Sequence, residues 1–132
     1  NCRIFPGVTV AQIEAELREV VANPEAEFKL LGDPTESPIS ETRADVLSAV
    51  GKAVHSRYPG LQMITYMSSG GTDAMHFRGA GVPTWGVGSI FMNPDEVFAH
   101  GLNERVPIKA FYDALDHWSI IIRELAGEGW MG

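Results

Sequence analysis

The chain has 132 residues, of which 45% are hydrophobic and 20% charged, so it can bury one core, but it lacks an apolar run long enough to cross a bilayer. Its formal net charge of -7, without a Lys/Arg cluster, opposes binding to a phosphate backbone, so neither a membrane nor a nucleic acid is expected as a partner. The only cysteine, Cys2, excludes an internal disulfide and a cysteine-based zinc cluster, and it leaves cytoplasmic and periplasmic locations both open.

The first residues have the pattern of a strand interior. Residues 3–5 form a short, mainly apolar run, and Pro6-Gly7 is a turn dipeptide that ends it. The chain opens without an initiator Met, a basic segment or a signal-like apolar stretch, and we interpret it as a fragment of a longer protein.

A capping box predicts the first helix. Thr9 can cap the helix, and Gln12, three residues later, can bond back to the cap. Apolar residues then recur at helical spacing until Asn23-Pro24 ends the helix. Alternating apolar positions predict a strand over residues 25–31. The opening part is therefore expected to be strand, helix, strand.

Residues 32–40 predict a crossover between domains, because they carry glycine, two prolines and several small polar side chains. We place the boundary near residue 36. This assigns residues 1–35 to one domain and residues 36–132 to a second.

The second part of the chain alternates helices and strands. Ser40 is expected to cap a helix that ends at Tyr58-Pro59-Gly60. Strands are expected over residues 61–67 and 82–87, with a short helix through Phe77 between them. This alternation predicts the α/β class.

The last helix is predicted from Pro107, since proline is favoured in a first helical turn. Its large apolar residues recur at helical spacing and are expected to face the core. They are Ile108, Phe111, Leu115, Trp118, Ile122 and Leu125. His55 and His117 also fall within predicted helices, and we interpret them as surface or hydrogen-bonded side chains.

A glycine-rich turn is the first candidate for chemistry. Gly70-Gly71-Thr72 can expose backbone N–H groups and a hydroxyl to an anion. A tight turn in which Thr72 or Asp73 only caps the next helix explains the same pattern. His76 follows closely enough to line the same cleft, although burial near Phe77 explains it as well.

The second candidate is the loop that contains His100. A neutral imidazole suits zinc, and the neighbouring carboxylate of Glu104 could orient the ring or bind the same ion. A loop histidine hydrogen-bonded to backbone is the alternative. Ser69, Asp73 and His100 can also be drawn as a triad, but nothing in the sequence places Ser69 on an exposed turn.

Three short motifs, in this order, resemble the co-catalytic zinc family of aminoacylase, succinyl-diaminopimelate desuccinylase, acetylornithine deacetylase and the bacterial glutamate carboxypeptidases. Residues 1–7, Asn-Cys-Arg-Ile-Phe-Pro-Gly, are similar to the family's Arg-bearing strand near the end of its lid or dimerisation domain. Residues 70–74, Gly-Gly-Thr-Asp-Ala, match its Gly-Gly-Thr-Asp turn. Residues 100–106, His-Gly-Leu-Asn-Glu-Arg-Val, match its terminal metal-binding segment.

The resemblance covers nearly the whole chain and implies an α/β protein. Residues 1–35 would be the end of an α+β lid or dimerisation unit, and residues 36–132 the C-terminal part of a zinc-peptidase-like α/β catalytic domain. The resemblance implies that His100 is a metal ligand and that the other metal ligands and the general base lie outside this chain. The substrate-binding residues that it implies are Arg3, Gly71, Thr72 and Asn103.

The function that the resemblance implies is hydrolysis of peptide or N-acyl amide bonds, with about two zinc ions in the complete active site, or cobalt or manganese in their place. The substrate would be a small peptide or an N-acyl amino acid, and the chain alone is expected to be inactive. A homodimer through the lid domain is also expected. The alternative is a non-catalytic α/β module that binds a small anion at the Gly70–Thr72 turn without metal.

Overall fold

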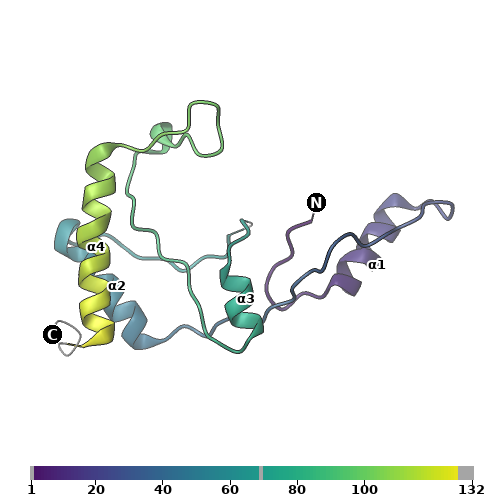
Figure 1. Ribbon diagram of the computed structural model, residues 1–132, viewed down its shortest axis with the longest axis horizontal. Coiled ribbons are helices and arrows are strands. Elements are labelled where there is room, and N and C mark those ends of the chain that lie inside the picture. The colour runs from purple at the N-terminus through teal and green to yellow at the C-terminus, as the bar shows by residue number, and fades with distance from the viewer. Residues whose placement is uncertain (1, 69, 128–132) are drawn as a thin grey trace. The chain divides into compact units, whose positions relative to one another are not determined.

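The regular elements of the computed structural model, which describes residues 2–68 and 70–127, are helices (Figure 1). They are α1 (Val10–Val21), α2 (Ala44–Arg57), α3 (Ala74–Gly79), the short 3-10 helix η1 (Pro94–Glu96) and α4 (Ile108–Ala126). Among the described residues, no helix is both long and apolar enough to span a membrane. The chain divides into two units, Asn1–Glu41 with Thr65–Gly86 and Thr42–Ile64 with Val87–Gly132.

Helix α1 begins at the predicted capping box. The Thr9 hydroxyl accepts a hydrogen bond from the Gln12 N–H at 3.2 Å, and the Gln12 side-chain oxygen accepts one from the Thr9 N–H at 2.8 Å. The helix ends where Ala22 adopts the left-handed conformation, with φ 49°. These local bonds confirm the predicted helix and both of its ends.

The segment 36–41 joins the parts of the first unit. On one side, the Glu36 carboxylate accepts a hydrogen bond from the Val10 N–H at 2.8 Å. On the other side, the Ser40 hydroxyl accepts one from the Thr84 N–H at 2.9 Å. The prediction that Ser40 caps α2 is therefore wrong, because α2 begins only at Ala44 and the hydroxyl serves a distant backbone group instead. The domain boundary near residue 36 stays a prediction.

The second unit is built on the packing of α2 against α4 (Figure 1). Most of the residues buried between them are small, and small side chains let two helices approach closely. They are Ala49, Gly51, Ala53 and Val54 of α2, and Ala110, Ala114, His117 and Ile121 of α4. This contact is the described core.

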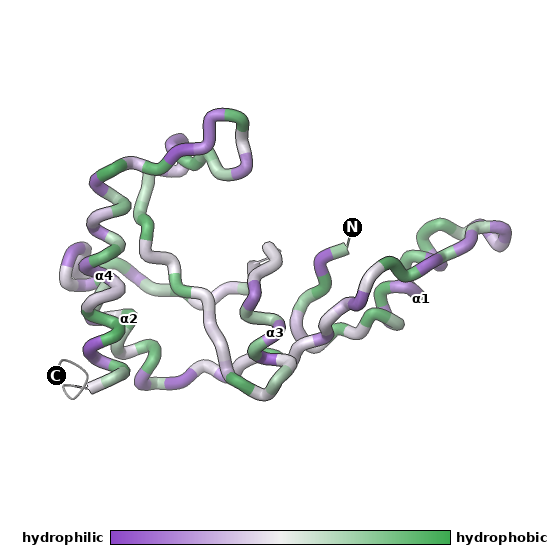
Figure 2. The backbone as a smooth tube through the Cα atoms, in the orientation of Figure 1, coloured by the Kyte–Doolittle hydropathy of each residue, from purple (hydrophilic) through white to green (hydrophobic). Residues whose placement is uncertain are grey.

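The prediction for the buried face of α4 is wrong. Figure 2 shows apolar stretches along this helix, but the large residues expected in the core are exposed, from 40% at Trp118 to 77% at Ile108. The buried residues, from Ala110 to Ile121, lie one position away from that stripe, which is about 100° around the helix. The spacing of the large apolar residues identifies an apolar stripe on α4. Helix α2 packs instead against the neighbouring face of α4, where most of the residues are small.

The predicted strands over residues 3–5, 25–31, 61–67 and 82–87 do not form in the part of the chain that the structure describes. A strand needs a neighbour that bonds its N–H and C=O groups, whereas a helix bonds its own. The helices therefore form without such a neighbour and the strands do not. The described chain has helices as its only regular elements, and the α/β class is not confirmed.

Candidate functional site

The glycine turn leads directly into α3. Asp73 is the residue before the helix, and its side chain makes no capping hydrogen bond. Gly70 donates its N–H to the Ser68 hydroxyl at 3.1 Å, and the Thr72 carbonyl accepts from the Met75 N–H at 3.3 Å. Thr72 is exposed. The turn is thus closed by the Ser68 hydroxyl and by the Thr72 carbonyl, and Asp73 does not play the capping role that the sequence left open.

Arg3 lies against Gly71 in the same unit. A Cβ atom added to Gly71 would be 3.0 Å from Arg3 Nη1 and 3.8 Å from Arg3 Cζ, so glycine permits this close approach. Arg3 is exposed, and it makes no ion pair or hydrogen bond with another described residue. Two of the predicted substrate-binding residues therefore meet, and the guanidinium donors remain available to an anion.

His100 occupies a tight loop with an unusual backbone. Its φ is 62°, in the left-handed region that residues with a Cβ seldom adopt. The Glu104 carboxylate accepts a hydrogen bond from the His100 N–H at 3.2 Å, and the Glu104 N–H donates to the Gly101 carbonyl at 3.1 Å. Within the described residues the imidazole itself makes no hydrogen bond. The carboxylate thus contacts the backbone of His100 and not its ring.

An aromatic contact follows at the end of the same loop. The guanidinium carbon of Arg105 lies 3.5 Å from the centre of the Phe98 ring, a cation–π contact. Arg105 Nη1 also donates to the Asn103 carbonyl at 3.5 Å. Asn103, predicted to bind substrate, is exposed in this loop.

The predicted site residues fall into two groups, each within one unit. Arg3, Gly71 and Thr72 belong to the first unit, whereas His100 and Asn103 belong to the second. Ser69, the serine of the alternative triad, lies outside the described residues.

A metal site is not complete in the described chain. Residues 2–68 and 70–127 hold no group of three or more His, Cys, Asp or Glu side chains that could bind an ion. Zinc in proteins takes about four ligands, of which three or more come from side chains. The described residues around His100 therefore do not form such a group, and its role as a metal ligand stays a prediction.

His117 is a buried polar residue that sequence reasoning missed. It is 5% exposed, so its interpretation as a surface side chain is wrong, and its Nε2 has no hydrogen-bond partner among the described residues, so the ring is only partly hydrogen-bonded. Its ring meets the Phe91 ring edge-on at 5.8 Å. Burial, and then the charge of Arg57, lower the pKa of His117, while a hydrogen bond with the Ala53 backbone acts in the opposite direction. The sequence signal that could have identified the burial of His117 is its helical spacing with the small residues Ala110 and Ala114.

Arg57 links α2 to α4 beside His117. Its guanidinium pairs with the Asp113 carboxylate and, at 3.2 Å, with that of Asp116. Lys109 also reaches Asp113, at 2.6 Å. The hydrogen bonds from Arg57, and then from Lys109, lower the pKa of Asp113. This network is structural, because it joins the two packed helices and leaves the candidate residues of the His100 loop untouched.

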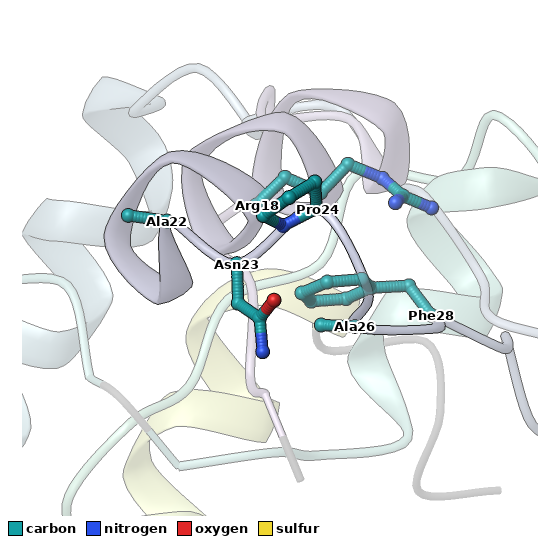
Figure 3. Close-up of a pocket in the computed structure, with 6 residues that line it drawn as sticks. All are labelled: Arg18, Ala22, Asn23, Pro24, Ala26 and Phe28. Carbon is teal, nitrogen blue, oxygen red and sulfur yellow. The ribbon is translucent and has the colours of Figure 1, made fainter.

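A hollow of 280 Å³ lies at the end of α1 (Figure 3). It is lined by Arg18, Ala22, Asn23, Pro24, Ala26 and Phe28. The Arg18 guanidinium lies 4.5 Å from the centre of the Phe28 ring and is paired with Glu14 at 2.5 Å. None of the predicted site residues lines this hollow, and the Arg18 guanidinium that lines it is already paired with the Glu14 carboxylate.

Comparison with known proteins points to one family. The sequence profile of peptidase family M20/M25/M40 matches residues 3–124. N-fatty-acyl-amino acid synthase/hydrolase PM20D1 of Bos taurus is 24% identical over 115 residues, and that of Homo sapiens is 26% identical over the same length. Each alignment covers 84% of this chain but 23% of the relative, so the chain spans less than a quarter of these proteins. No solved structure matches the chain significantly.

Proposed function

This chain belongs to peptidase family M20/M25/M40, and we propose that it is the C-terminal part of a metal-dependent amide hydrolase that acts on N-acyl amino acids or small peptides. Both relatives are named for N-fatty-acyl-amino acids, compounds in which an amide joins an acyl group to an amino acid. Such a substrate carries a free carboxylate next to the scissile amide. An arginine side chain is well suited to bind that carboxylate.

The apposition of Arg3 and Gly71 is the observation that carries this proposal. A guanidinium binds a carboxylate through two parallel hydrogen bonds, and Arg3 has its donors available. Gly71 supplies the space for the guanidinium, and the exposed Thr72 follows directly in the chain. In this proposal, Arg3, Gly71 and Thr72 hold the substrate carboxylate, and a substrate-binding role of Asn103 rests on the family resemblance alone.

His100 is proposed as one ligand of the metal centre. The family is generally metal-dependent, and a neutral imidazole suits zinc, with cobalt and manganese as alternatives. Zinc bound there would supply Lewis acidity and an activated water. Since the described residues complete no metal site, the other ligands and the general base would come from the remainder of a longer protein, and this chain alone would be inactive.

The same proposal accounts for the segments without regular structure. In the longer protein, residues 61–67 and 82–87 would pair with strands outside this chain and give the α/β catalytic domain expected over residues 36–132. Residues 1–35 would then belong to a lid or dimerisation domain and support a homodimer.

Replacement of Arg3 by alanine tests the carboxylate role. In the longer protein, Arg3→Ala should lower kcat/KM for an N-acyl amino acid by about 10- to 100-fold, since hydrogen bonds to charged groups are lost. The loss should be small for the same substrate with an amidated carboxyl group. Gly71→Ala should act in the same direction, because its Cβ displaces the Arg3 guanidinium from its 3.0 Å approach.

Arg18→Ala is the matched control, because Arg18 is also an exposed arginine of the first unit and pairs with Glu14. Its kinetics should be unchanged with both substrates. Equal losses on the free and amidated substrates would remove Arg3 from the carboxylate site. Tight binding of phosphate at residues 70–72 by the metal-free protein, without hydrolysis, would favour the anion-binding module instead.

A further inference from the structure

The carboxylate of Glu104 reaches back along its own loop to His100. Its Oε1 accepts the His100 N–H at 3.2 Å, while the Glu104 N–H donates to the Gly101 carbonyl at 3.1 Å. Glu104 therefore closes the loop twice, once at His100 through its side chain and once at Gly101 through its N–H. This contact goes to the backbone of His100, which leaves the imidazole nitrogens to other partners.

The backbone of His100 needs such support. A residue with a Cβ is disfavoured at φ 62°, and it persists there only when surrounding contacts fix it. The Glu104 bond holds the N–H of that residue. The direction in which His100 leaves the backbone thus depends on the Glu104 contact.

We propose that Glu104 is a positioning residue that fixes the backbone of His100 and so presents its imidazole to the metal. This inference rests on the proposed function, because it takes His100 to be a metal ligand. Residues that orient a metal ligand through a hydrogen bond affect metal binding without touching the ion. Glu104 acts in this way through the main chain of its target.

The experiment uses the longer protein and compares Glu104→Ala with Glu104→Gln. Glutamine keeps a side-chain oxygen that can accept the His100 N–H, whereas alanine removes it. Zinc affinity, measured by competition with a chelator, should fall about 10- to 100-fold in Glu104→Ala and stay near wild type in Glu104→Gln. In the metal-free protein, the His100 amide should exchange about tenfold faster in Glu104→Ala, since it loses its acceptor.

Two parallel variants separate the failure of this inference from the failure of the proposed function. Glu96→Ala removes a nearby exposed carboxylate that bonds the Asn93 side chain, and it should change neither measurement. If His100→Ala retains all of its zinc, the proposed ligand role fails. If His100→Ala loses zinc but Glu104→Ala keeps both its affinity and its slow amide exchange, the positioning role is overturned. Equal losses of affinity in Glu104→Ala and Glu104→Gln would also overturn it, since they would make the carboxylate itself a ligand.

Discussion

His117 is a titratable ring in the contact between α2 and α4. Its Nε2 has no partner among the described residues, and the positive charge of Arg57 from α2 disfavours a second positive charge on the ring. Asp113 and Asp116 lie on the same helix as His117, but their carboxylates are paired with Arg57. A proton on the buried ring would thus meet a desolvation cost and a like charge, so the neutral form is favoured.

The free energy of unfolding should therefore fall when the pH drops below about 6.5, the pKa of histidine in an unfolded chain. In that range the unfolded state takes up a proton that His117, with its lowered pKa, does not. Because the unfolded state then binds more protons than the folded state, the free energy of unfolding decreases as the pH falls, until the pH reaches the folded-state pKa of His117. Above about pH 6.5 both states leave His117 neutral, so the free energy of unfolding does not depend on this residue. Urea unfolding between about pH 5 and pH 8 measures the effect.

His117→Leu should remove this pH dependence, because leucine has no proton to bind. It also deletes the unpartnered nitrogen, and the Ala53 carbonyl keeps its hydrogen bond from the Ser56 hydroxyl at 2.8 Å. At neutral pH the variant should be as stable as the wild type or more stable by about 1 kcal/mol. His76→Gln changes an exposed histidine of the first unit and should leave the pH dependence intact. An unchanged dependence in His117→Leu would assign it to another group.

At the level of elements, α2 carries a glycine in its buried interior. Gly51 has an ordinary helical backbone, so a Cβ there meets no conformational barrier. The nearest atom is Met63 Cε, 3.2 Å from the added Cβ, and it is the flexible end of a side chain that is 40% exposed. Alanine at this position should gain helix propensity while Met63 moves aside.

Gly51→Ala should raise the free energy of unfolding by about 0.5–1 kcal/mol, because alanine loses less backbone entropy than glycine in a helix. The midpoint of urea unfolding, at unchanged slope, measures it. Met63→Ala provides the matched background, since it removes the neighbouring methyl group. In the Met63→Ala background, Gly51→Ala should raise the free energy of unfolding by at least as much as in the wild type. A loss of stability in the wild-type background alone would mean that Met63 has no room to move.

Short-range bonds explain which elements the sequence predicted well. Thr9 and Gln12 are three residues apart and bond each other, so the start of α1 follows from the sequence alone. Ser40 bonds Thr84 instead of capping α2, and the strands need neighbours that the described residues do not supply. These outcomes depend on segments that are distant in the sequence, and a local sequence pattern does not show where those segments lie.

The same distinction applies to the candidate site. His100 and Glu104 lie in one loop, and the sequence analysis paired them. It expected the Glu104 carboxylate to orient the His100 ring or to bind the same ion, whereas in the structure the carboxylate accepts the backbone N–H of His100. Arg3 and Gly71 are far apart in the chain, so spacing could not pair them; the family resemblance named both as substrate-binding residues, and the structure shows their close approach. The burial of His117 was missed because periodicity favoured the larger apolar residues one position away.

At the level of the whole molecule, burial is unevenly divided between the two units. Every buried residue that the structure describes belongs to the second unit, and all of these residues lie in α2 or α4. In the first unit, neither α1 nor α3 has a buried residue. That unit is held by its cap, by turns and by the hydrogen bonds of the segment 36–41. Exposed hydrogen bonds open at little cost, whereas those in a packed core open only when the packing is lost.

Hydrogen exchange of the 132-residue chain should therefore separate the two units. Amides in the middle of α2 and α4 should exchange slowly and share one opening free energy, because the two helices lose their packing together. Amides of α1 and α3 should exchange much faster, close to the rates of isolated short helices, which are marginal in water. Ala114→Gly, which opens the packed face of α4, should speed exchange in both α2 and α4 and leave α1 unchanged. Equal protection of α1 and α4 would contradict this division, since it would require a core in the first unit that its exposed side chains do not form.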